Sequence, residues 1–195
     1  MPPRLFESLR LDELELDNRI LIAPMCQYSA SAGEAGDWHM MHLGHLAMSG
    51  AGLLTLEATA VSPEGRITDV DLGLYNDACE RALARVLGAV REYAPIPVCI
   101  QLAHAGPKAS MQRPYGGDGP LTQADMDRGD RPWDIVSASA QPVDVGWLVP
   151  EALDASGIGK VKADFAAAAR RALKAGFEVV ELHCAHGYLL NAFLS

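Results

Sequence analysis

Four short apolar runs recur along the chain, separated by loops and by stretches with helical periodicity. The runs are nearly continuous and do not alternate with polar residues, which is typical of strands in a parallel sheet that is covered by helices. Strands are therefore predicted over residues 18–25, 52–58, 96–102 and 177–183.

Helical patterns lie between these runs and predict helices over 37–48, 77–93 and about 156–175. Each of the last two helices is expected to bury one apolar face. The face of the second consists of Leu83, Val86, Leu87 and Val90, and that of the third of Ile158, Val161, Phe165, Ala169, Ala172 and Leu173. Alternation of strand and helix indicates right-handed β/α units, and four are counted.

Parallel β/α units begin either a doubly wound sheet or a (β/α)8 TIM barrel. A doubly wound dinucleotide-binding sheet would carry a glycine-rich turn after its first strand, but residues 23–28 read A-P-M-C-Q-Y. A barrel needs eight units and about 250 residues. With 195 residues, the chain is predicted to cover the first four units, as the N-terminal part of one barrel domain.

Residues 105–153 interrupt the alternation of strands and helices with a segment rich in Gly, Pro and Asp. Loops of this length are usually functional or disordered. We interpret it as a lid-like insertion above the third strand, with 133–139 forming a strand of a small hairpin. A disordered insertion is the alternative.

Composition limits the partners. A formal net charge of -9 and a pI near 5.0 disfavour nucleic acid and anionic membranes. The N-terminus lacks the apolar segment of a secretory signal, and the sequence has no apolar window long enough to span a bilayer. The four cysteines are scattered and expected to be reduced, so a cytoplasmic protein is predicted.

The carboxyl ends of the predicted strands carry the candidate chemistry, as in β/α barrels generally. These ends supply histidines, a thiol, a primary amide and phenols, with few exposed carboxylates. Such a set favours binding a neutral heterocycle and polarising an oxygen over holding a hard cation.

The same positions resemble a known family. The motifs are P-M-C-Q-Y at 24–28, D-W-H at 37–39, E-A-T-A-V-S-P-E-G-R at 57–66, Q-L-A-H-A-G at 101–106 and E-L-H-C-A-H-G-Y-L-L-N-A-F-L-S at 181–195. In order and spacing they resemble the old yellow enzyme family. The cysteine at 26 is similar to the bacterial, thermophilic-like branch of NADPH dehydrogenases and xenobiotic reductases. The resemblance spans the chain but about half of a family member.

This resemblance implies a flavin-binding (β/α)8 barrel that uses FMN, with NADPH or NADH as reductant. It implies that the cofactor-binding residues are Ala23, Pro24, Met25, Cys26, Ala60 and Gln101. Cys26 matches the thiol that contacts the flavin, and Gln101 matches the amide that reads its pyrimidine edge. The alternatives are a buried structural cysteine and a polar strand-end residue that faces solvent.

The resemblance also implies catalytic roles. His183 and His186 match the pair that hydrogen-bonds the substrate oxygen where negative charge develops. Tyr188 matches the proton donor, and Tyr28 matches a phenol that closes over the substrate. The implied activity is an ene-reductase acting on activated alkenes, such as enones, or on nitro compounds, in a parent that is a homo-oligomer.

Two departures and two rival readings remain. Pro107 stands where the family usually has arginine. The family's flavin-ring arginine and phosphate site come from later strands, so the chain is alternatively a non-catalytic half-barrel. A rival interpretation is a metal-dependent hydrolase, in which the metal ligands would be His183 and His186, with His104 and Glu57 on neighbouring strands. No metal is expected, and the row His39, His42 and His45 is interpreted as ordinary helix packing with partly exposed histidines.

Overall fold

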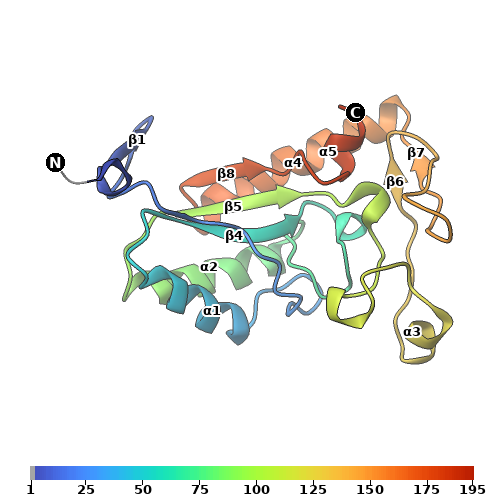
Figure 1. Cartoon of the computed structure of the whole chain (residues 1–195), viewed down its shortest axis with the longest axis horizontal. Helices are drawn as coiled ribbons and strands as arrows, with labels where there is room; N and C mark the ends of the chain where they lie inside the picture. The colour runs from blue at the N-terminus through green and yellow to red at the C-terminus, as the bar shows by residue number, and fades with distance from the viewer. Residues whose placement is uncertain (1–2) are drawn as a thin grey trace.

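The computed structural model describes residues 3–195, and its centre is a four-stranded parallel sheet (Figure 1). The strands lie in the order β3 (Leu21–Ile22), β4 (Leu53–Ala60), β5 (Val98–Ala103) and β8 (Val179–Leu182). All four predicted strands are confirmed, with different bounds: β3, β5 and β8 are shorter than predicted, and β4 extends two residues further. Each strand is added beside the one before it, without the reversal of a doubly wound sheet. This order is that of a barrel.

Three helices cover one face of the sheet, and the main core lies between them and the strands. They are α1 (Asp37–Ala47), α2 (Asp77–Arg91) and α4 (Ala155–Ala175). Side-chain caps begin α2 and α4, where Asn76 accepts the Cys79 N–H and Asp154 accepts the Gly157 N–H. Gly176, with φ of 103°, ends α4 in a left-handed conformation, as its position after the apolar pattern predicts.

The predicted apolar faces are confirmed for α2 and only in part for α4. All four named residues of α2 are buried. On α4, Val161 and Ala172 are buried, but Ile158 is 37% and Leu173 66% exposed. The helix packs on α2 and β5 along a narrow stripe that includes Ala168. The flanks of the predicted face therefore have no cover within residues 3–195.

An antiparallel hairpin that the sequence analysis missed precedes the sheet. It consists of β1 (Leu9–Leu11) and β2 (Leu14–Leu16), after a 3-10 turn at η1 (Arg4–Phe6). Leu16 is fully buried in a cluster with Leu53 and Cys99. The hairpin lies at the end of the sheet opposite the strand arrowheads (Figure 1). Its strands are too short and too rich in charge to stand out in an apolar pattern.

Residues 105–153 lie at the carboxyl ends of the strands (Figure 1) and carry short elements of their own. These are η3 (Gly106–Lys108), η4 (Pro114–Gly116), α3 (Gln123–Asp127), β6 (Val136–Ser137) and β7 (Glu151–Ala152). The strand predicted within 133–139 is confirmed, but the hairpin is wrong because β6 pairs with β7 in parallel. That the segment acts as a lid stays a prediction.

The segment is fastened to the loop that follows β4, which contains η2 (Pro63–Gly65). The Trp133 indole donates to the Glu64 carbonyl at 3.0 Å, and the Arg66 guanidinium lies 5.2 Å from the Trp133 ring. Arg113 pairs with Asp69 at 3.0 Å. The chain ends with α5 (Leu189–Ala192), whose Leu189 is fully buried. Among residues 3–195, no helix is both long and apolar enough to cross a membrane.

Burial predicts how two leucines on the helices contribute to stability. Leu83→Ala, at a fully buried site on α2, should lower the free energy of unfolding by about 2–5 kcal/mol because it leaves a cavity. Leu173→Ala, at an exposed site on α4, should change it by less than about 0.5 kcal/mol. Urea titration followed by circular dichroism measures both. Equal losses would place Leu173 in the core.

Candidate active site

A register shift between β4 and β5 sets which side chains face the site. Leu56 pairs with Ile100, but the next pair is Thr59 with Leu102, so two residues of β4 oppose one of β5. This arrangement is a β-bulge at Glu57 and Ala58, and it reverses which later residues of β4 share a face with β5. Ala60 pairs with Ala103, two residues beyond Gln101. Ala60 and Gln101 therefore lie on the same face of the sheet.

Gln101 is nearly buried and fixed by a carboxylate. Its Nε2 donates to Glu181 Oε1 at 2.6 Å across the β5–β8 pair, in which Gln101 and Glu181 are directly opposite. A primary amide also has a second N–H and a carbonyl oxygen, which remain the natural contacts for a ligand. With an exposed fraction of 9%, Gln101 does not project into solvent.

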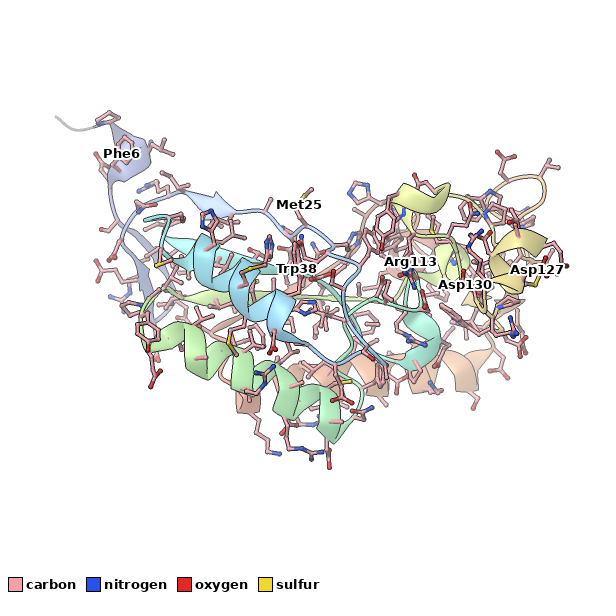
Figure 2. All side chains as sticks on the ribbon, turned by 90° about the horizontal axis from the view of Figure 1, so that it is seen from below. Phe6, Met25, Trp38, Arg113, Asp127 and Asp130 are labelled. Carbon is pink, nitrogen blue, oxygen red and sulfur yellow. The ribbon has the colours of Figure 1, made fainter. Side chains whose placement is uncertain are left out.

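The segment 23–28 runs along the edge of the sheet after β3. Met25 projects outward (Figure 2) and is 67% exposed, and Ala23 is exposed as well. Pro24 and Cys26 are half-buried, and Cys26 packs on the cluster that contains Ile67 and Tyr188. Ala23 and Met25 border a cavity of about 150 Å³ that Glu57 also lines.

Burial keeps the Cys26 thiol protonated. Burial, followed by the nearby carboxyls of Asp71 and Glu57, raises the pKa of Cys26 to about 12. The thiol is therefore a neutral, polarisable contact and a poor nucleophile at neutral pH.

His183 and Tyr188 form the centre of the second group of predicted residues. Their rings stack with centroids 4.5 Å apart, and the His186 ring lies 5.4 Å from that of His183. The Ala185 N–H donates to His183 Nδ1 at 3.3 Å, so neutral His183 carries its proton on Nε2. Burial, followed by the neighbouring His186, lowers the pKa of His183. At neutral pH His183 is thus an uncharged hydrogen-bond donor.

A cavity of about 330 Å³ unites three of the predicted residues, Tyr28, His186 and Tyr188. Its other walls come mainly from the segment 105–153 and are Ile67, Lys108, Met111, Asp118, Val143 and Trp147. Tyr28 and His186 both have left-handed backbones, with φ of 50° and 60°. Strained non-glycine conformations tend to cluster at functional sites. Burial also raises the pKa of both tyrosines, so each phenol keeps its proton.

The family resemblance implied no role for three residues that organise this region. Lys108 donates to the His186 carbonyl at 2.7 Å, Glu181 holds the Gln101 amide, and Glu57 accepts the Gln27 N–H at 2.7 Å. Lys108 follows Pro107, where the sequence departs from the expected arginine, and both lie in the turn η3. The spacing of Gln101 and Glu181, each late in its strand, was the available signal for their pairing.

The histidine row on α1 is only partly as expected. His45 is exposed and His42 is half-buried, but His39 is 1% exposed, so its predicted partial exposure is wrong. His39 turns inward because its Nδ1 accepts the Gly36 N–H at 3.1 Å. Within residues 3–195, no three His, Cys, Asp or Glu side chains are grouped as a metal site would require.

Comparison with protein families decides the identity of this half-barrel. The model of the NADH:flavin oxidoreductase / NADH oxidase family matches residues 4–195. The chain belongs to this family. The family of the old yellow enzyme, expected from the motifs, is thereby confirmed, and the metal-dependent hydrolase loses its support.

Curated relatives agree with that assignment. The chain is 42% identical over 193 residues to the NADH:flavin oxidoreductase FG08077 of Gibberella zeae, covering 98% of this chain and 46% of that protein. It is 42% identical over 194 residues to an NADPH dehydrogenase of Listeria monocytogenes serotype 4a, covering 98% and 51%. The chain therefore spans about half the length of these relatives.

Solved structures confirm the fold. Morphinone reductase superposes with a TM-score of 0.82 at 28% identity, covering the whole of this chain and 51% of that one. Morphinone reductase in complex with tetrahydroNAD superposes with a TM-score of 0.81, covering 99% and 52%. These proteins are (β/α)8 barrels, so the chain has the fold of about the first four β/α units of a TIM barrel.

The thiol environments predict selective alkylation. At pH 8 a thiol with a pKa near 12 is ionised to about one part in ten thousand, so Cys26 should react slowly with iodoacetamide. Cys184 is exposed and should be the first cysteine to be labelled. Peptide mass spectrometry follows each site, with Cys184→Ser as the control. Labelling of Cys26 before Cys184 would contradict the buried, protonated state.

Proposed function

We propose that this chain contributes the substrate side of an FMN-dependent NAD(P)H oxidoreductase of the ene-reductase type, which reduces activated C=C bonds. The observation that carries the proposal is the cavity in which Tyr28, His186 and Tyr188 converge, with His183 stacked on Tyr188. Membership of the family supports the flavin and nicotinamide chemistry.

The side chains at the carboxyl edge of the sheet fit a flavin. Gln101 offers a donor and an acceptor side by side, the pattern that a pyrimidine edge requires. Ala60 and Ala103 are small neighbours on the same face, and Cys26 supplies a neutral sulfur. When bound, FMN supplies the hydride-transfer chemistry between the nicotinamide and the substrate. We assign Ala23, Pro24 and Met25 to the same contact surface.

The chain's own residues would polarise and protonate the substrate. His183, as a neutral Nε2–H donor, and His186 would bind the carbonyl or nitro oxygen, so that negative charge developing there is stabilised. Tyr188 would give its proton to the carbon alpha to the activating group. Tyr28 would close the cavity, and Lys108 would hold the strained backbone at His186.

A cytoplasmic location, NADPH or NADH as the reductant and a homo-oligomeric parent belong to the same proposal. One observation favours the second candidate, a half-barrel without activity of its own. Leu21 on β3 and Leu182 on β8, the two outer strands of the sheet, are 50% and 53% exposed. Unpaired apolar edges of this kind are completed by further strands in a closed barrel.

Titration of the 195-residue chain with FMN separates the two candidates. If the residues above form enough of the ring site, the visible flavin band should shift and its fluorescence should change in a saturable way. Gln101→Leu, which removes the paired donor and acceptor, should weaken this binding by about tenfold. An unperturbed flavin spectrum would favour the inactive half-barrel.

The proton-donor assignment predicts a split between half-reactions. In the full-length enzyme, Tyr188→Phe should slow alkene reduction by about a hundredfold or more, because a positioned general acid is lost. Flavin reduction by NADPH should stay within about twofold, because that step needs no proton from Tyr188. Stopped-flow absorbance follows each half-reaction separately. Equal slowing of both would remove Tyr188 from this role.

A further inference from the structure

A buried carboxylate lies behind the segment that carries Cys26. Glu57 is 4% exposed, and its Oε2 accepts the backbone N–H of Gln27 at 2.7 Å. Gln27 follows Cys26 directly, and its side chain adds two further contacts to the loop. Its Nε2 donates to the Met25 carbonyl at 2.8 Å, and its Oε1 accepts from the Trp38 indole at 3.2 Å.

The second oxygen of Glu57 faces a histidine whose tautomer is fixed. His39 Nδ1 accepts the Gly36 N–H, so the proton of neutral His39 is on Nε2. That Nε2 is buried and 3.6 Å from Glu57 Oε1, and it has no hydrogen-bond partner among the described residues. Both oxygens of Glu57 thus face N–H groups, an arrangement that suits a carboxylate and not a second donor.

The β-bulge places Glu57 for this task. Glu57 and Ala58 are the two residues of β4 that oppose Gln101, and bulges commonly redirect side chains beside active sites. One local irregularity therefore sets the direction of Glu57 and also turns Ala60 to the face of Gln101.

We infer that Glu57, in contact with His39, is the positioning residue of the segment 23–28, and that its hydrogen bond with the Gln27 N–H becomes stronger when its carboxyl group ionises. Ala23 and Met25 are exposed, and Pro24 and Cys26 are half-buried. The Gln27 N–H, bonded to Glu57, fastens the backbone of the segment to β4. That the segment contacts FMN rests on the proposed function, but the hydrogen bond between Glu57 and the Gln27 N–H does not.

Charges around Glu57 place its titration in an accessible range. The pKa of Glu57 is raised to about 8, chiefly by burial and also by Asp71, while the hydrogen bond from the Gln27 N–H lowers it. The other titratable groups nearby are His39, His42 and Cys26. Burial lowers the pKa of His39 to about 4 and raises that of Cys26 to about 12, so neither changes charge near pH 8. The pKa of His42 is also lowered, and burial raises that of Asp71 to about 6, so among these groups only Glu57 has its pKa between 7 and 9.

Amide hydrogen exchange of Gln27, measured by NMR on the 195-residue chain, tests this inference. Glu57→Gln should raise the exchange rate by about tenfold to a hundredfold, the factor for losing a bond to a charged acceptor. The Ala30 N–H, which donates to the Val70 carbonyl, is the internal reference and should change by less than about twofold. Asp125→Asn is the matched control, because Asp125 is a buried carboxyl that bonds Thr122 and Gln112 and not Gln27.

The pH profile separates positioning from mere packing. In the unaltered chain, protection of Gln27 relative to its intrinsic exchange rate should increase as pH rises through about 8, because the ionised acceptor is stronger. In Glu57→Gln this increase should disappear. Unchanged protection of Gln27 in Glu57→Gln, or a flat profile in the unaltered chain, would overturn the inference. FMN titration of the unaltered chain is read separately, so absence of flavin binding there would count against the proposed function alone.

Discussion

The parallel pairing of β4 with β5, and the one-residue shift within it, is the constraint on which the site depends. These two strands are the buried centre of the sheet, and every residue of both is buried. Because side chains alternate along a strand, a register without the bulge would turn Ala60 toward the helices. The bulge lets β4 pack Leu54 and Leu56 against the helices and still present Ala60 beside Gln101.

Two buried carboxyl groups, Glu57 and Asp71, organise the loops above this sheet. Asp71 accepts the N–H groups of Ile67 and Thr68 at 2.6 and 3.1 Å, which fixes the loop after β4. Neighbouring backbone then bonds to the loop on both sides: Ala30 donates to Val70, and Met111 donates to Ile67. Buried carboxyl groups cost free energy unless they are hydrogen-bonded, so these contacts are strongly specified. The first loop and the segment 105–153 consequently share one support.

The sequence pattern predicted the parts of the structure in which a large apolar surface is buried. Four strands and three helices follow from continuous apolar runs and from the 3.6-residue period, as the buried stripe of α2 illustrates. The hairpin at 9–16 was missed because it places only Leu16 in the core. The exposure of Leu173 was missed because periodicity identifies an apolar face and not the element that covers it. Motif resemblance named most side chains of the candidate site, but the supporting carboxylates Glu57 and Glu181 are visible only once register and bulge are known.

The buried groups of the site converge on uncharged states. Burial protects the protons of Cys26, Tyr28 and Tyr188, and it keeps His183 neutral with its proton on Nε2. Fixed neutral donors such as these stabilise negative charge that appears only during the reaction. Under the proposed function, this is what an activated alkene requires, since its oxygen becomes negative only as hydride arrives. The exception is Glu57, whose pKa is raised to about 8, and its charge is turned away from the substrate cavity toward the backbone of Gln27. The same desolvation that keeps these side chains uncharged therefore also raises the pKa of Glu57, the group that supports the loop beneath the cavity.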